Sequence, residues 1–335
     1  MAKYIFVILS VLSMVLIGLK LHRGDFVDGG MWADQATFFL TKNPELYDFR
    51  QAYGHPGGPV IEAEIAIHTL TGIKNEDADI WFLSIFGGIL IGGICTLCYI
   101  LRRNVLWSVA VFGLLTLNPL FSESTPPSIL VAYLLTFLII FTLYLLEGER
   151  LNWKTGLLWS VIAGMAVATR TDVASVTTAT LGILLIIHYN YRKVAALAAA
   201  SIAFFCLFDP FMWYMPIKHV QDLLYKVIFH YSDFPQPNQL SLMDVSQLSA
   251  LAAASLALAW LTIAFRRKLK SPYPVSFVIG ITVLTILEYT IFLTSAYQAD
   301  RYFLPIVCIW QVLLPYTAFY LISHVEFTFL SPGKQ

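Results

Sequence analysis

The chain has 335 residues, of which 58% are hydrophobic and 13% are charged, and its formal net charge is zero. This charged share is about half of that in soluble domains, so a soluble fold of this length would lack the polar surface to cover itself. A balanced charge also provides no basic surface for nucleic acid. The composition therefore predicts an all-α polytopic membrane protein with membrane lipid, and not nucleic acid, as its surroundings.

Apolar runs long enough to span a membrane recur along the whole chain, which predicts a single transmembrane domain over residues 1–335. The first run ends in GLKLHRG without a small-residue cleavage site, so we interpret it as a retained anchor rather than a signal peptide. The sixth run contains several Thr and Ser and has the weakest hydropathy. About ten spans are predicted, at roughly 4–20, 79–101, 104–121, 127–146, 154–169, 173–189, 193–209, 246–265, 273–294 and 302–323.

Two long segments separate these runs, at residues 20–78 and 210–245. The first contains an amphipathic stretch at 31–41, the Gly/Pro turn AYGHPGGP, and a helix-like run at 59–71 that is too short and too charged to span. The second contains a predicted interfacial helix at 216–230. These short helices either pack against lipid or form a roof over a cavity.

Positive charges set the predicted topology. With the N-terminus in the cytoplasm, each short inside linker is basic, as the positive-inside rule requires. Both termini are then cytoplasmic, the two long segments lie outside, and the inside linkers are too short to hold a nucleotide-binding domain. The sequence therefore predicts a multi-pass protein of the cell membrane whose active face is extracytoplasmic. The basic linkers are Arg102-Arg103, Arg150 with Lys154, Arg192-Lys193 and Arg266 to Lys270.

Several carboxylates stand at predicted outer positions. Asp28 and Asp34 follow the first run, and Glu123 lies on the linker before the fourth. Helix capping is the alternative for Asp28, and solvation is the alternative for Glu123. Glu288 lies within the ninth run, roughly 9 Å from its outer end at about 1.5 Å per residue. An ionisable side chain at that depth usually faces a functional cavity, although it can also bond to a neighbouring helix.

Two arginines run against the insertion rule, because Arg170 in VATRTD and Arg301 in YQADRYFLP stand on short outer linkers. Each needs a partner, which is either the nearby Asp172 or Asp300 or an anionic ligand such as a lipid phosphate. His55, in the Gly/Pro turn, is interpreted as a turn-stabilising residue near the site rather than as a catalyst.

Glu64 and His68 stand four residues apart and could ligate a metal together, but no third ligand accompanies them. No metal site is therefore predicted from this pair.

Together these features resemble the GT-C superfamily of membrane glycosyltransferases, nearest to the protein mannosyltransferase and aminoarabinose transferase branch. The family's order of an acid, an aromatic, an Ala-bearing helix and a His/Pro turn is matched by Asp28, Trp32, Ala36 and His55-Pro56. ESTPPSILVAYLL resembles the segment entering the fourth span, GMAVATRTD the Arg-bearing end of the fifth, and DRYFLP the late Arg-Tyr motif. The likeness covers the layout of residues 1–310, with Gly29 in place of the family's second acid.

The resemblance implies transfer of a sugar from a polyprenyl-phosphate donor to an acceptor hydroxyl on a lipid, polysaccharide or protein, with inversion. Asp28 would be the general base, and Glu123 would bind the acceptor or hold a divalent cation with Asp28. Arg301 and Arg170 would bind the donor phosphate. Tyr302 completes the candidate site residues, with Asp34, His55 and Glu288 as substrate or cavity positions.

Two alternatives remain open from the sequence. A secondary transporter or lipid flippase would show two similar halves and charges near mid-membrane, and only Glu288 is placed in that way. A non-catalytic relative that acts as an assembly subunit is the second alternative, because Gly29 replaces an acid that the family carries.

Overall fold

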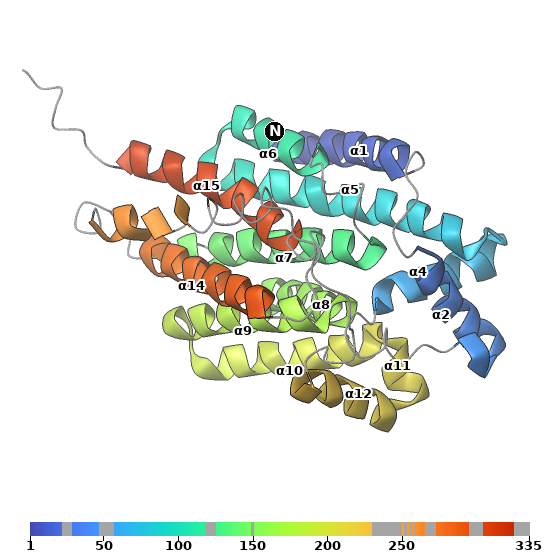
Figure 1. Cartoon of the computed structure of the whole chain (residues 1–335). Coiled ribbons are helices and arrows are strands. Elements are labelled where there is room, and N and C mark those ends of the chain that lie inside the picture. The colour runs from blue at the N-terminus through green and yellow to red at the C-terminus, as the bar shows by residue number, and fades with distance from the viewer. Residues whose placement is uncertain are drawn as a thin grey trace, which may run out of the picture.

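A computed structural model gives the fold of the chain as a bundle of helices (Figure 1). The structure describes residues 1–21, 29–46, 57–117, 125–148, 151–229, 250, 253–254, 256–257, 259–264, 273–294 and 304–324. Within these ranges every regular element is a helix and there is no strand. The all-α prediction is therefore confirmed for the part of the chain that the structure describes.

In the part of the chain that the structure describes, five helices are long and apolar enough to cross a membrane, which indicates a membrane-embedded protein. The Thr- and Ser-bearing run at 173–189, the weakest by hydropathy, is among them. The five are α1 (Ala2–Leu21), α5 (Asn75–Arg102, with the span at Asp77–Arg102), α7 (Pro126–Glu147), α9 (Thr171–His188) and α10 (Tyr191–Phe208).

Four more of the predicted runs also fold as helices: α6 (Val105–Thr116), α8 (Trp153–Thr169), α14 (Tyr273–Thr294) and α15 (Leu304–His324). They fall short of the length or apolarity of the other five over the residues that the structure describes. The prediction of ten spans is therefore confirmed for five helices, and the remaining count stays a prediction.

Helix α7 forms the centre of the bundle. Of its most apolar window, 89% is buried, and α5, α8, α9 and α15 all pack against it. Its sequence is apolar on every side, as expected for a helix that neighbours surround completely. Helix α1 lies on the outside of this core against α5, and α10 packs against α8 (Figure 1).

The two ends of the bundle differ. At one end, the Arg102 end, Arg102 Nη2 lies 3.2 Å from Glu147 Oε1, and the Tyr316 hydroxyl bonds to both side chains. This contact joins α5, α7 and α15. Tyr189, near the start of α10, donates to the Leu145 carbonyl 2.6 Å away, which brings the α9–α10 connection to the same end.

The opposite end, the α4 end, holds the short helices of the two long segments (Figure 1). These are α2 (Gly29–Thr41), the 3₁₀ helix η1 (Pro44–Leu46), α4 (Gly58–Thr71), α11 (Pro210–Tyr214) and α12 (Pro216–Phe229). Helices thus occupy the stretches predicted at 31–41, 59–71 and 216–230, whereas their place in outer segments and at the membrane interface stays a prediction. Helix α4 packs against α2, α5, α8 and α11, so it links the two long segments to the bundle.

Candidate functional site

The start of α4 is fixed against three other helices through Gly57. Its backbone N–H donates to the Thr169 carbonyl at the end of α8, 3.2 Å away. Gly57 has φ +61°, which glycine adopts without strain. A Cβ placed there would lie 3.1 Å from the Trp32 ring of α2 and 3.2 Å from Pro127 of α7. The turn predicted from AYGHPGGP therefore ends where α2, α7 and α8 meet.

Gly58 fixes the same turn against a fourth helix. A Cβ on Gly58 would lie only 2.1 Å from the Phe208 carbonyl oxygen, at the end of α10. Backbone packs directly on backbone here, so no larger side chain fits without a shift of the chain. The start of α4 is thus held between α8 and the α10–α11 junction, and the α4 end of the bundle is a tightly packed assembly.

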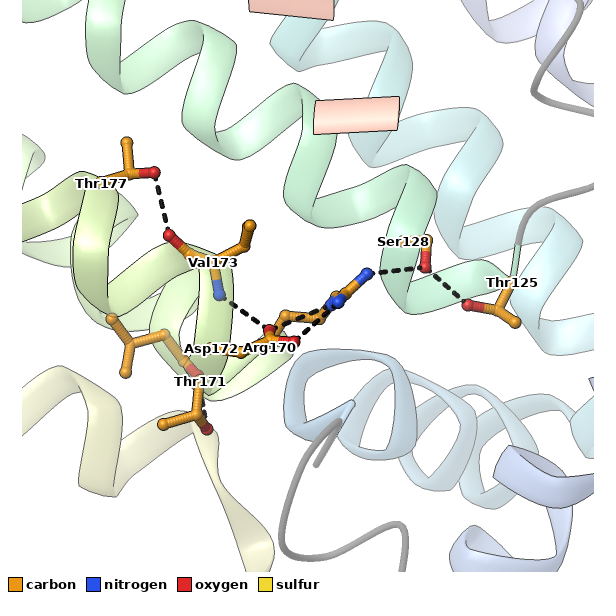
Figure 2. Close-up of polar contacts among 8 residues, drawn as sticks. Thr125, Ser128, Arg170, Thr171, Asp172, Val173 and Thr177 are labelled. Atoms are coloured by element: carbon orange, nitrogen blue, oxygen red, sulfur yellow. Dashed lines mark hydrogen bonds and ion pairs between the residues drawn. The ribbon is translucent and has the colours of Figure 1, made fainter. Parts of the chain in front are cut away.

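Arg170 lies beside this turn and is the single residue between α8 and α9 (Figure 2). Its Nη2 lies 2.8 Å from Asp172 Oδ2 and its Nε lies 3.2 Å from Asp172 Oδ1, a bidentate ion pair. Its Nη1 points to Ser128 Oγ at 3.5 Å. The Arg170 side chain is only 2% exposed. The guanidinium group therefore binds the first turn of α9 and the first turn of α7 together.

Ser128 extends this network to the end of the segment that precedes α7. Its hydroxyl lies 2.9 Å from Thr125 Oγ1, the residue just before the helix. Pro126 and Pro127 occupy the first positions of α7, where a missing backbone N–H costs nothing. The start of α7 is held in place by these polar contacts, and it follows Glu123 by only a few residues.

The predicted site residues fall in two groups. Arg170 is described, and the structure shows the ion pair with Asp172 that was the alternative to a phosphate-binding role. Asp34 is exposed on α2, and Glu288 belongs to α14, although its side chain is outside the described part. The others lie outside the described residues, so their roles stay predictions: Asp28, His55, Glu123, Arg301 and Tyr302.

No metal site was predicted, and a divalent cation held by Asp28 and Glu123 was one of two roles open to Glu123; both residues lie outside the described ones. Among the described ranges, no group of three or more His, Cys, Asp or Glu side chains is placed to hold a metal ion. Glu64, which sequence reasoning paired with His68, is fully buried in the bundle. His68 instead has its Nδ1 2.9 Å from the Ile73 carbonyl, at the C-terminal end of α4.

Sequence reasoning missed a buried acid–imidazole pair at the α10–α11 junction. Asp209 Oδ2 lies 2.7 Å from His219 Nε2, and both side chains have no exposed surface. Asp209 Oδ1 also accepts from the Phe211 backbone N–H at 3.1 Å and so caps α11. The His219 ring stacks on Phe211, 5.4 Å between ring centres. An Asp followed by Pro210 was a readable helix-start signal, but nothing local pointed to its partner ten residues later.

Glu62 of α4 lies close to this pair. Burial, together with the negative charge of Asp209, raises the pKa of the Glu62 carboxyl to about 8. One of its oxygens is buried without a hydrogen-bond partner among the described residues. Glu62 is therefore mostly protonated at neutral pH, and it can donate a hydrogen bond as an uncharged acid.

This raised pKa predicts a pH-dependent stability. Because the folded protein keeps the Glu62 proton up to pH about 8 while the unfolded chain loses it near pH 4.5, stability falls as pH rises between these values. Glu62→Gln should remove this loss, which we expect to be about 2 kcal/mol because the side chain is partly exposed. Thermal unfolding of the purified protein at pH values from about 5 to about 9 measures this loss of stability. Glu45→Gln, on exposed η1, is the matched control, and parallel pH profiles for wild type and Glu62→Gln would contradict the prediction.

Comparisons of the chain with protein-family models, with curated proteins and with solved structures gave no match. The likeness to the GT-C glycosyltransferases therefore depends on the sequence motifs alone.

Proposed function

We propose that this chain is a membrane glycosyltransferase that moves a sugar from a polyprenyl-phosphate donor to an acceptor hydroxyl. The supporting observation is that residues next to three predicted site positions meet at the α4 end. Trp32 follows Asp28 by four residues, Gly57 follows His55 by two, and Thr125 follows Glu123 by two. Trp32 and Gly57 pack with Pro127, and Thr125 joins the Arg170 network through Ser128.

The site is proposed to face the extracytoplasmic side. Basic linker residues gather at the opposite end of the bundle, where Arg102 pairs with Glu147 and the α9–α10 connection carries Arg192 and Lys193. Positive residues mark the cytoplasmic side of membrane proteins, so both termini are assigned to the cytoplasm and the α4 end to the outside. A donor carried on a lipid phosphate then reaches the site within the outer leaflet, and no nucleotide is needed there.

The proposed reaction is one in-line displacement. The oxygen of the acceptor hydroxyl bonds to the anomeric carbon while Asp28 accepts the hydroxyl proton. The bond from the anomeric carbon to the phosphate oxygen breaks in the same step. The polyprenyl phosphate leaves with both bonding electrons, and the anomeric centre is inverted. Arg301 stabilises the charge that develops on the leaving phosphate. Glu123 orients the acceptor or, with Asp28, holds a divalent cation that lowers the charge of the site.

Arg170 is given a different part in this proposal. Its guanidinium already contacts Asp172 and Ser128, and almost none of its surface is exposed. It is therefore assigned as a positioning residue that holds the starts of α7 and α9 at the site. Donor-phosphate binding is assigned to Arg301.

The test is the class of donor that the protein consumes. Purified protein in lipid vesicles is given a panel of polyprenyl-phosphate sugars with radiolabelled sugar, or the matching nucleotide sugars, with a membrane extract as the source of acceptors. We expect label to leave at least one lipid donor, with release of polyprenyl phosphate and no use of nucleotide sugars.

Two outcomes contradict the proposal. If every lipid donor keeps its label but moves between the two leaflets, the protein is a flippase. If no donor of the panel is consumed or moved by a correctly folded protein, the transferase assignment falls and an assembly subunit is the better interpretation.

A further inference from the structure

A groove of about 530 Å³ lies on the surface of the α4 end, apart from the Arg170 network. Its walls are mainly apolar and aromatic, and its lining includes the two polar side chains Lys42 and Glu62. The aromatic wall is built from several rings in edge-to-face contact, with Phe39 5.1 Å from Phe211 and 6.0 Å from Tyr214 between ring centres. The groove is therefore a preformed feature of packed helices α2, α4 and α11.

The groove begins where one of the candidate membrane spans ends. Helix α10 is one of the five candidate spans and ends at Phe208, and the groove residues Pro210, Trp213 and Tyr214 follow at once. Trp213 is 60% exposed, and Trp and Tyr are enriched at membrane interfaces. The next helix continues the exposed apolar surface with Ile217, Val220 and Leu224.

Lys42 supplies a positive charge to this groove. It makes no ion pair with a carboxylate among the described residues, and its Nζ lies 4.2 Å from the centre of the Tyr214 ring. Lys42 ends α2 with φ +58°, a conformation that glycine or asparagine adopts at lower cost. The chain thus places a lysine where helix termination alone favours a smaller residue, and the cation is held over the aromatic wall.

The one acid in the groove lining does not oppose an anion. Glu62 is mostly uncharged at neutral pH, for the reasons given above, and can donate a hydrogen bond. Asp209 is buried and paired with His219 from α12. The groove therefore combines one exposed cation and one acid proton donor with an apolar wall, which suits a phosphate group attached to an acyl chain.

We propose that this groove binds an anionic phospholipid, with the lipid phosphate on Lys42 and Glu62 and the upper acyl chains against Trp213. The lipid is proposed to be distinct from the sugar donor, because no predicted site residue is among the residues that line the groove. This inference depends on the protein being embedded in a membrane and not on its being a transferase, so it can fail or hold independently of the proposed function.

The test uses Trp213 as a local probe. Protein is reconstituted in phosphatidylcholine vesicles with a small fraction of phosphatidylglycerol brominated on its acyl chains, or of phosphatidylcholine brominated in the same way. Bromine quenches tryptophan nearby, and subtraction of the Trp213→Phe variant isolates the Trp213 signal. We expect phosphatidylglycerol to be enriched at Trp213 about fivefold, the ratio that corresponds to about 1 kcal/mol for one lysine near anionic lipid.

Matched variants define the role of Lys42. Lys42→Ala should abolish the enrichment, Lys42→Arg should keep it, and Lys74→Ala should leave it unchanged, because Lys74 is exposed at the start of α5 and does not line the groove. Equal quenching by the two brominated lipids in wild type would overturn the proposal. So would Lys42→Ala with full enrichment, because the charge of Lys42 would then have no part in the binding.

Discussion

Replacing Asp28 with alanine is expected to reduce sugar transfer by about 100- to 10,000-fold, the range that general base catalysis contributes. In the proposed reaction no other group takes the acceptor proton, so the loss should appear in kcat with little change in the donor KM. Asp28→Asn should be equally inactive, because an amide keeps the shape but does not accept a proton. Initial rates of label transfer in vesicles, with equal amounts of folded protein, measure both variants.

Asp77→Ala is the control for a general effect of removing an acid at the same end of the bundle. Asp77 is exposed in the first turn of α5, and its removal should leave transfer within a few-fold of wild type. Wild-type turnover by Asp28→Ala would remove Asp28 from the mechanism. A similar loss in both variants would show that charge at this end, and not proton transfer, governs the rate.

The helices of this fold were predictable because hydropathy and length alone determine them. A run such as 127–146 must be helical in lipid, since its backbone groups have no other partners, and α7 covers it. The run at 173–189 carries several Thr side chains, yet these bond back to carbonyls one turn earlier, as Thr177 does to Val173 at 2.9 Å. Hydroxyl groups satisfied within their own helix make the span less polar than its sequence indicates.

The pairs that join segments were harder to predict, since single-sequence patterns carry no long-range contacts. Arg170 with Asp172 was foreseen as an alternative, because the two residues are close in sequence. The proximity of Asp209 to Glu62 and His219 was not foreseen. Asp209 comes close to both only because the chain changes direction between α10 and α11, next to the start of α4. Two glycines beside prolines indicate a close approach of backbones, so Gly57 and Gly58 gave a usable signal. The sequence did not indicate that the approaching backbone is that of Phe208.

Replacing Arg170 with alanine is expected to lower the free energy of unfolding by about 2 kcal/mol. The variant takes the Arg170 guanidinium away from the Asp172 carboxylate, which costs about 3–5 kcal/mol for a fully buried pair and less here, because Asp172 is 30% exposed. Transfer should fall about tenfold, since the starts of α7 and α9 lose their common contact. Chemical unfolding in detergent and donor titration of the transfer rate measure the two effects.

The double variant Arg170→Ala/Asp172→Ala separates positioning from phosphate binding. If Arg170 acts as a positioning residue, removing Asp172 as well takes away the uncompensated carboxylate, so stability should recover by about 1 kcal/mol. Transfer should stay about tenfold low, because α7 and α9 still lack their common contact. The donor KM should stay at the wild-type value in both variants. If the KM instead rises in Arg170→Ala and remains high in the double variant, the guanidinium contacts the donor phosphate, as the motif alone indicated. The Arg170–Asp172 ion pair would then exist only in the absence of donor. Breaking this ion pair would lower the net free energy of donor binding.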